Sequence, residues 1–253
     1  MSRIYAAKTD LKKDKVKEFF KKRSSKIDEV GLLSVTMYQN SELALKRDEY
    51  EKQVVLPYLG LSSATRVLDI GCGTGRWGCF LADKVGAYLG VDFCLNYVQA
   101  AQSIFNASGY DQRNFFFQLL SVDEINVNNV AISAPFDLII IAGVMVYLND
   151  ENIISLLHKL VEFSHDGTII YIREPTGIEQ RLTLDEFFSE ELQENYSAIY
   201  RTSLEYEKFF KDILCPIGFE LTHSQPLYSV DLCNRQETQQ HFFILELKKD
   251  RVL

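Results

Sequence analysis

The chain has 253 residues, of which 47% are hydrophobic and 25% charged, a composition typical of a soluble globular protein with a sizeable core. Its formal net charge of −8 argues against a broad nucleic-acid-binding face, because such a face needs an excess of lysine and arginine to neutralise phosphates. The five cysteines form neither a C-x-x-C pair nor a zinc-type cluster with histidine, and no apolar run approaches the roughly 18 residues of a membrane span. We therefore expect a cytoplasmic protein with reduced thiols and no membrane span.

The first 60 residues are predicted to form a helical segment with a basic start. Residues 1–26 carry ten Lys or Arg against three Asp or Glu, a local charge of +7. Apolar residues recur at helical spacing in residues 10–30, which predicts an amphipathic helix, and residues 40–60 predict a second helix. The basic run fits either a solvated helix face or a contact with an acidic surface or partner.

Short apolar segments alternate with helical segments between residues 65 and 175. The predicted strands are 65–71, 87–93, 114–120, 136–144 and 168–175, and the predicted helices between them are 76–86, 94–109 and 150–167. The run FDLIIIAGV at 136–144 is continuously apolar, as a strand buried on both faces requires. This alternation predicts a doubly wound α/β fold with a mostly parallel sheet, which binds ligands outside the carboxyl ends of its strands.

The pattern changes after Pro175. Capping boxes at Thr183–Glu186 and Thr202–Glu205 predict the starts of two short helices, and hence a helical cap inserted at about 178–213. Two strand-like runs follow, at 219–232 and 241–249, and their spacing suits an antiparallel addition to the sheet edge. The complete sheet is then expected to have seven strands.

A glycine-rich turn, Asp69-Ile-Gly71-Cys72-Gly73-Thr-Gly75, follows the first predicted strand and precedes a helix. Glycines let the chain turn sharply and let a ligand approach the backbone, and the helix N-terminus offers free N–H donors to a carboxylate or a phosphate. A dinucleotide site would need G-x-G-x-x-G, but the sixth position counted from Gly71 is Arg76. The turn therefore has a different spacing from that of a dinucleotide fingerprint.

The segment VLDIGCGTGRWG closely resembles the signature loop D/E-x-G-x-G-x-G of class I S-adenosylmethionine (SAM)-dependent methyltransferases. Gly90-Val-Asp92 and the FDLIIIA run at 136–142 resemble the second and fourth strands of that family, so that the resemblance covers roughly residues 35–175. It implies a SAM-dependent methyltransferase with a Rossmann-like catalytic domain over residues 61–253. Residues 1–60 would then cover the cofactor.

The resemblance also implies a set of cofactor contacts. Asp92 would bind the ribose hydroxyls, Phe93 would pack on the adenine, and either Ser121 or Asp123 would serve the adenine side. Tyr38 and Arg47 would cover SAM and bind its methionine carboxylate. The full expected cofactor set is Asp69, Gly71, Cys72, Gly73, Gly75, Asp92, Phe93, Ser121, Val122, Ala142, Tyr38 and Arg47.

Methyl transfer from a sulfonium needs an aligned acceptor and often the removal of one proton, but no metal. Tyr147 follows the fourth strand, where related small-molecule enzymes carry a His or Tyr, so it is a candidate base or orienting group, or only a packing aromatic. Arg173 and Glu174 end the fifth strand and are candidates for acceptor binding or proton transfer, or for an ion pair that fixes the cap. His241 begins the last strand and could reach the site from there.

The overall resemblance is to small-molecule methyltransferases, especially those encoded with bacterial surface-polysaccharide genes. We accordingly expect a small-molecule acceptor, which would be a sugar, a phosphorylated metabolite or an amine, and a role in capsular polysaccharide modification. Two alternatives are a protein or RNA methyltransferase and a SAM-binding module without catalysis. The acidic charge disfavours RNA, and residues 142–145 (AGVM) lack the Asn/Asp-Pro-Pro-Tyr motif of base and glutamine N-methyltransferases.

Overall fold

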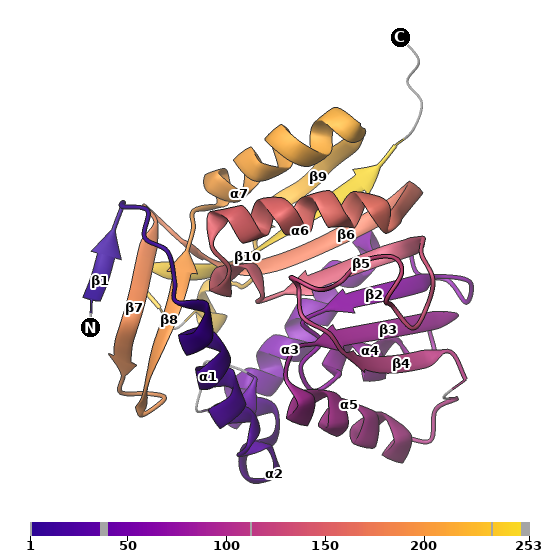
Figure 1. Ribbon diagram of the computed structural model, residues 1–253, viewed down its shortest axis with the longest axis horizontal. Coiled ribbons are helices and arrows are strands. Elements are labelled where there is room, and N and C mark those ends of the chain that lie inside the picture. The colour runs from indigo at the N-terminus through magenta and orange to yellow at the C-terminus, as the bar shows by residue number, and fades with distance from the viewer. Residues whose placement is uncertain (1, 36–39, 112, 234, 249–253) are drawn as a thin grey trace.

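The computed structural model describes residues 2–35, 40–111, 113–233 and 235–248, which form a seven-stranded and a three-stranded β-sheet (Figure 1). The larger sheet has the strand order β4-β3-β2-β5-β6-β10-β9, and the smaller sheet has the order β1-β7-β8. The strands are β1 (Ser2–Tyr5), β2 (Arg66–Ile70), β3 (Ala87–Asp92), β4 (Phe115–Leu119), β5 (Phe136–Ala142), β6 (Ser164–Gly177), β7 (Leu182–Ser189), β8 (Glu194–Tyr200), β9 (Phe219–Pro226) and β10 (Thr238–Leu247).

The large sheet has the predicted doubly wound topology. Strands β2 to β6 pair in parallel, whereas β10 pairs antiparallel with both β6 and β9. The chain moves outward from β2 through β3 to β4, then returns to place β5 on the other side of β2. The switch point of the sheet therefore lies between β2 and β5, and the carboxyl ends of both strands meet there.

Helices cover both faces of this sheet. They are α1 (Lys13–Ser24), α2 (Ile27–Val30), α3 (Ser41–Val55), α4 (Arg76–Leu81), α5 (Leu95–Ala107), α6 (Asp150–Glu162) and α7 (Ser203–Phe209), with short turns of tighter or wider helix at Gly31–Ser34, Leu56–Tyr58, Met145–Tyr147, Phe210–Leu214, Cys215–Ile217 and Val230–Leu232. Helix α3 begins after Asn40, whose side-chain oxygen accepts the N–H of Leu43 at 3.0 Å. Within the described residues, no helix combines the length and apolarity that crossing a bilayer would require.

The core consists of two apolar layers that the sheet separates. Along β2, Leu68 and Ile70 face the layer that contains the apolar side of α6, whereas Val67 faces the layer that contains Trp77 of α4 and Val55 of α3. This alternation is the two-residue period of a strand, and it gives each helix layer its own set of buried partners. The sheet is thus buried on both sides, as its apolar run at 136–144 predicts.

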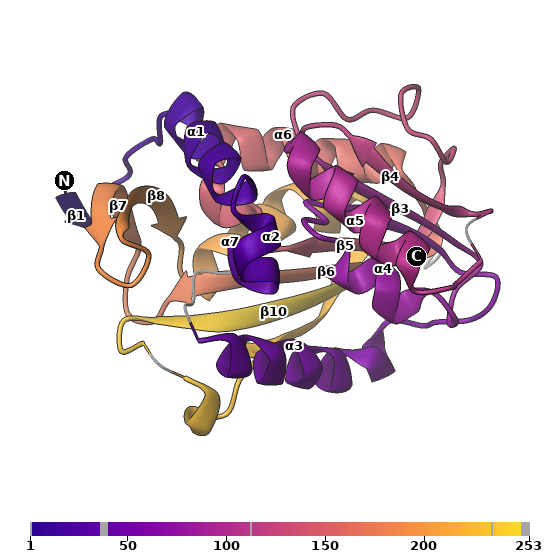
Figure 2. The ribbon, with the colours of Figure 1, turned by 90° about the horizontal axis from the view of Figure 1, so that it is seen from below.

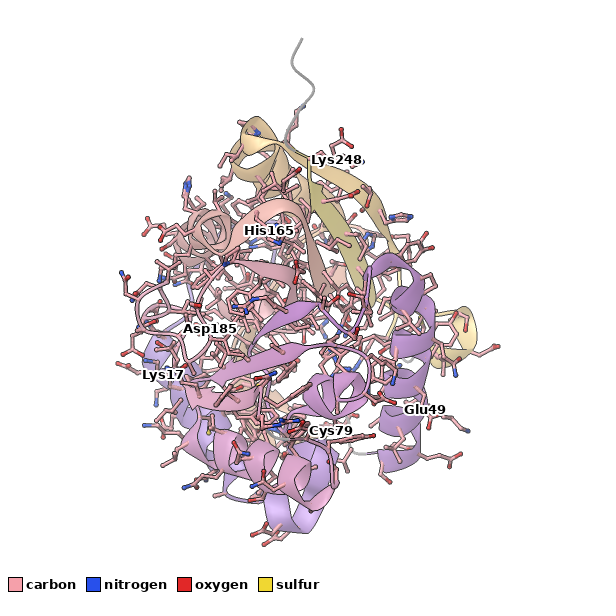
Figure 3. All side chains as sticks on the ribbon, turned by 90° about the vertical axis from the view of Figure 1, so that its right-hand side faces the viewer. Lys17, Glu49, Cys79, His165, Asp185 and Lys248 are labelled. Atoms are coloured by element: carbon pink, nitrogen blue, oxygen red, sulfur yellow. The ribbon has the colours of Figure 1, made fainter. Side chains whose placement is uncertain are left out.

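The helices α1 and α3 flank the sheet from different sides. Figure 2 shows α1 beside the smaller sheet and α3 along the larger one, and Figure 3 shows the labelled Lys17 of α1 and Glu49 of α3 on opposite flanks. The basic residues of the N-terminal run pair with acids of the same chain: Lys8 with Asp150, Lys12 with Glu186, Lys13 with Asp123, and Lys22 with Glu194. These lysines remain more than half exposed, so each pair contributes little by itself.

The predicted helical cap is partly wrong. The helix expected to begin at Thr183 is strand β7, because Thr183 is fully buried and pairs with Ile199 of β8, and a strand pairing outweighs a local capping motif. The helix expected after Thr202 is confirmed as α7, where the Thr202 hydroxyl accepts the N–H of Glu205 and the Glu205 carboxylate accepts the N–H of Thr202. The cap is therefore a small antiparallel sheet followed by one helix.

The guanidinium of Arg201, just after β8, joins the cap to the larger sheet. Arg201 is fully buried, and its Nε donates to Asp150 at 2.8 Å. Its two terminal nitrogens donate to the carbonyl oxygens of Met145 at 3.0 Å and Leu148 at 2.7 Å. These carbonyls belong to the turn after β5, so Arg201 fixes that turn against the cap.

We expect Arg201→Met to lower the free energy of unfolding by about 3–5 kcal/mol, because it removes the side-chain donor to the Leu148 carbonyl, one of two donors to the buried Met145 carbonyl, and one partner of Asp150. Urea denaturation followed by circular dichroism measures this loss. Arg113→Met is the matched control, because Arg113 lies on the surface and pairs only with Asp111 among the bonds of the described residues. A loss for Arg201→Met no larger than that of the control would contradict the prediction.

Candidate active site

A cavity lies at the carboxyl edge of the parallel strands, where the doubly wound fold predicts a ligand site. Its walls come from the turns after β2 to β5, from the end of β6, and from α1 and α3. Eleven of the predicted site residues line it: Arg47, Gly71, Cys72, Gly73, Asp92, Phe93, Ser121, Val122, Ala142, Tyr147 and Arg173. Tyr38 lies outside the described residues.

The glycine turn is packed against the turn after β5. Gly71 and Cys72 donate their N–H groups to the carbonyl of Val91 at 2.8 and 3.0 Å, which closes the turn over β3. Gly71 has a φ of +76°, and a Cβ on it would lie 2.3 Å from the side chain of Val144. The absence of a side chain at this position is therefore what lets the two turns meet at the switch point.

Two of the predicted motif residues lie behind the turn rather than on the cavity wall. Gly75 also has a φ of +76°, and it faces Phe117. Asp69 is buried and accepts the hydroxyl of Tyr88 at 2.6 Å. Burial raises the pKa of Asp69 to about 7, although the bond from Tyr88 opposes this rise. Both residues hold the shape of the turn from within the protein.

Asp92 ends β3 on the cavity wall with both carboxylate oxygens fixed. One oxygen accepts the N–H of Gly73 at 3.0 Å, and the other accepts the N–H of Cys94 at 2.9 Å. Burial raises the pKa of Asp92 to about 6, and these two backbone donors limit the rise. The carboxylate is thus held in one orientation with remaining lone pairs available to a ligand hydroxyl.

Both residues considered for the adenine side line the cavity. The hydroxyl of Ser121 donates to Glu124 at 2.7 Å, so it is engaged in a local turn. The carboxylate of Asp123 pairs with Lys13 of α1, which brings the basic N-terminal helix over this end of the cavity. The choice between Ser121 and Asp123 stays open.

The opposite end of the cavity is rich in charge. Glu51 of α3 is buried, with an exposure of 2%, and pairs with Arg76 at 3.0 Å and Arg173 at 3.3 Å. Asp48, one turn earlier on α3, binds Arg76 at 2.7 Å. Arg47 donates to the carbonyl of Leu232 at 2.8 Å. Three arginines and two carboxylates therefore meet where α3 crosses the sheet.

The sequence analysis missed Glu51 and Asp48, although a signal for Glu51 exists. Arg47 and Glu51 lie on the same buried stripe of α3 as Ala44 and Val55, at the three- and four-residue spacing of one helix face. Charged residues at positions where an amphipathic helix buries apolar ones point to partners inside the protein. Four side chains of α1 that were not predicted as site residues also line the cavity, namely Lys13, Val16, Lys17 and Phe20.

Tyr147 lines the cavity and packs edge-on against Phe20, with ring centroids 4.8 Å apart. Burial raises the pKa of Tyr147 above its ordinary value, so the phenol stays protonated at neutral pH. A general base would need the opposite shift. The geometry thus favours a hydrogen-bonding or packing role for Tyr147 over that of a base.

Glu174 and His241 do not line the cavity. Glu174 is fully buried and accepts the N–H groups of Val144 and Met145 at 2.9 Å, which fixes the turn after β5. Neighbouring residues of a strand point to opposite faces, so that only Arg173 of the predicted pair can reach the cavity. His241 is opposite Glu174 in the β6–β10 register and leaves the sheet on that same far face.

The Nε2 of His241 and the hydroxyl of Ser224 form a hydrogen bond of 3.0 Å, and burial lowers the pKa of His241 to about 4. Its imidazole is therefore neutral near pH 7, and it packs against Phe243 with centroids 4.7 Å apart. The sequence places His241 and Glu174 correctly near the carboxyl edge but does not reveal which face they occupy.

Comparisons with known proteins agree with this architecture. Residues 61–232 match the family model described as a methyltransferase domain. Phosphoethanolamine N-methyltransferase 3 of Arabidopsis thaliana is 30% identical over 145 residues, which are 57% of this chain and 28% of the relative. The phosphoethanolamine N-methyltransferase of Plasmodium falciparum is 28% identical over 197 residues, covering 78% of this chain and 68% of that protein.

Solved structures show the same fold. Phosphoethanolamine N-methyltransferase 1 of Haemonchus contortus, in complex with phosphoethanolamine and S-adenosylhomocysteine, has a TM-score of 0.72 at 20% identity and covers 95% of this chain and 50% of that one. The [4+2]-cyclase SpnF has a TM-score of 0.66 at 11% identity and covers 97% of this chain and 99% of that one. The fold thus carries different chemistries, and the identification rests on the family model, which matches more than half of the sequence.

The chain spans only about 28% of the length of the Arabidopsis relative. The comparisons do not test the resemblance to polysaccharide-modifying enzymes, which stays a prediction. The family model, the glycine turn and the sheet topology agree with one another, and they identify the chain as a member of the SAM-dependent methyltransferase family.

Proposed function

We propose that the protein transfers the methyl group of SAM to the nitrogen of a small phosphorylated amine, with phosphoethanolamine as the first candidate. The observation that carries this proposal is a single cavity that joins the glycine turn and Asp92 to a second region containing Arg173 and Tyr147. The names of the relatives support the acceptor class, because the Arabidopsis and Plasmodium proteins are both phosphoethanolamine N-methyltransferases.

The cofactor would lie across the carboxyl ends of β2, β3 and β4. Asp92 would accept the ribose hydroxyls, since its carboxylate is already oriented by Gly73 and Cys94. Phe93 and Val122 would contact the adenine under α1. The methionine arm would then extend along the glycine turn toward α3, where the arginines lie. This orientation brings the sulfonium methyl to the region between the turns after β2 and β5.

The acceptor would lie beside the methyl group, against Tyr147 and Phe20. Aromatic faces attract a cationic amine, and guanidinium or ammonium groups bind a phosphate. Arg173 lines the cavity and would supply the positive charge for the phosphate. Helix α1, which lines the cavity, would exclude water from the acceptor, which favours a small molecule over a polymer.

The reaction needs a neutral amine. A proton leaves the ammonium for solvent, the nitrogen lone pair then attacks the methyl carbon, and the carbon–sulfur bond breaks with its electrons going to sulfur. The products are the methylated amine and S-adenosylhomocysteine. Tyr147, protonated at neutral pH, would orient the amine by a hydrogen bond and not remove its proton. The protein would thus contribute mainly alignment and exclusion of water.

The acceptor class is tested by incubating the protein with SAM and phosphoethanolamine and measuring S-adenosylhomocysteine release. We expect turnover with phosphoethanolamine and at least about tenfold slower turnover with ethanolamine, because the phosphate contact with the guanidinium of Arg173 is lost. A sugar nucleotide and a peptide amine serve as further acceptors. Equal rates with ethanolamine, or turnover with the sugar nucleotide alone, would refute the proposed acceptor.

Binding of SAM should weaken at acid pH through Asp92. The ribose hydroxyls bind the carboxylate form, and the pKa of Asp92 is raised to about 6, so affinity is constant above that pKa and falls below it. Calorimetric titration between pH 5 and pH 8 should show up to about tenfold weaker binding for each pH unit below 6. Asp92→Asn should bind weakly at every pH without this slope. If the affinity of Asp92→Asn for SAM still falls with decreasing pH, the titrating group is another one, such as Asp69.

Tyr147→Phe should lower kcat by about tenfold to a hundredfold and leave the affinity for SAM unchanged, because one hydrogen bond to the acceptor is lost. The pH–rate profile should keep its shape, since the raised pKa of Tyr147 keeps the phenol from acting as the base. Steady-state kinetics across pH measure both quantities. Loss of one limb of the profile in this variant would show that Tyr147 does transfer the proton.

A further inference from the structure

The carboxylate of Glu51 lies between three side chains that approach from the sheet and the glycine turn. Its Oε1 accepts the Tyr171 hydroxyl at 2.7 Å, the Arg76 Nη2 at 3.1 Å and the Arg173 Nε at 3.3 Å. Glu51 belongs to α3, Arg76 to α4, and Tyr171 and Arg173 to β6. One buried carboxylate therefore connects three elements at the end of the cavity.

The two arginines carry more positive charge than Glu51 balances. Arg76 has a second carboxylate in Asp48, which also pairs with Lys52 at 2.5 Å. Arg173 pairs with Glu51 alone among the ion pairs of the described residues, and its Nη1 donates to the neutral amide of Gln240 at 3.2 Å. Both guanidinium groups line the cavity, so this end keeps a net positive charge that a bound anion can neutralise.

Burial by itself would raise the pKa of Glu51, but the adjacent Arg173 and Arg76 outweigh burial and lower this pKa to about 2. Glu51 is thus charged throughout the neutral range. A charged residue in this position separates two like charges that would otherwise repel each other inside the protein. The carboxylate occupies the Nε edge of Arg173, and so fixes the direction in which the rest of the guanidinium points.

The backbone after β5 makes room for Arg173. Gly143 has a φ of +77°, and a Cβ on it would lie 3.2 Å from Nη1 of Arg173. The guanidinium therefore lies over the turn that also contains Val144, the neighbour of Gly71. This second observation, independent of the ion pairs, locates Arg173 between the cofactor turn and the acceptor side of the cavity.

We infer that Glu51 is a positioning residue that holds Arg76 and Arg173 side by side as a binding site for one oxyanion. Two oxyanions can occupy it: the methionine carboxylate of SAM, or the phosphate of the acceptor. The phosphate as ligand rests on the proposed function, whereas the methionine carboxylate as ligand requires only that the chain binds SAM. Guanidinium groups suit either, because they form charge-assisted hydrogen bonds to a carboxylate or a phosphate. Among the hydrogen bonds of the described residues, those of Arg173 use its Nε and Nη1, so its Nη2 remains for the anion.

Glu51→Gln tests this inference, since it removes the charge and keeps the shape. Glu49→Gln is the matched control, on the same helix but exposed and pointing away from the sheet (Figure 3). Calorimetry measures the affinity for SAM and for SAM without its carboxylate. A second titration measures phosphoethanolamine binding to protein saturated with S-adenosylhomocysteine. Thermal unfolding of each variant reports structural damage.

We expect Glu51→Gln to lower the affinity for one of the two ligands by at least about tenfold, and Glu49→Gln to leave both affinities unchanged. If the carboxylate is the ligand, wild-type protein prefers SAM over its decarboxylated form, and Glu51→Gln loses most of that preference. If the phosphate is the ligand, the affinity for phosphoethanolamine falls and that preference is unchanged. A lower unfolding temperature with both affinities unchanged would overturn the inference, because Glu51 would then be only structural.

Tyr171→Phe provides a second test if Glu51→Gln does not fold. It removes one hydrogen bond to Glu51 and leaves every charge in place, so we expect a smaller loss of affinity for the same ligand. Wild-type affinities in Tyr171→Phe, together with an unfolded Glu51→Gln, would also overturn the inference. If wild-type protein does not bind phosphoethanolamine at all, the proposed acceptor fails, and the two SAM titrations alone decide the role of Glu51.

Discussion

The contact between Gly71 and Val144 at the switch point is the constraint on which the site depends. A side chain at Gly71 would collide with Val144, so the turns after β2 and β5 can meet only with glycine there. Glu174 fixes the other partner, because its buried carboxylate accepts the N–H of Val144. Tyr147 follows Val144 in the turn after β5, and Asp92 at the end of β3 accepts the N–H of Gly73 in the glycine turn, so both site residues are connected to this contact.

Much of the cavity wall comes from outside the segment that matches the family model. That match begins at residue 61, whereas α1 and α3 precede it and supply both the lysines and the buried Glu51. Outside the cavity, the small sheet joins β1, which precedes the matched segment, to β7 and β8, which lie within it. The segments before residue 61 thus supply part of the charge that lines the cavity, in addition to the matched core.

The sequence predicts the features that depend on local geometry. Glycines at 71, 73 and 75, and an acid at the end of the second predicted strand, predict the turn after β2 and the place of Asp92 on the cavity wall. Properties that depend on distant partners are not visible in this way. Thr183 has the spacing of a helix cap but becomes part of a strand, because its neighbours Ile4 and Ile199 come from segments far along the chain.

The dependence on distant partners also explains why the sequence predicts the site residues only in part. Arg173 and Glu174 are adjacent in sequence, and only their alternation on β6 assigns one to the cavity and the other to the interior. Glu51 was overlooked because an acid on a charged helix is usually solvated, and its two arginine partners come from separate elements. A charged residue on the buried stripe of α3 is the one local trace of that network.

The pairing of β1 with β7 has a consequence for the order in which the protein folds. Ser2 lies opposite Asp185, so β1 pairs with a strand from which it is separated by more than half of this sequence. Segments generally fold as they emerge, and such distant pairings form late. The parallel strands, which lie closer together in sequence, can therefore assemble before β1 and the α1 helix that follows it are fixed against the cap.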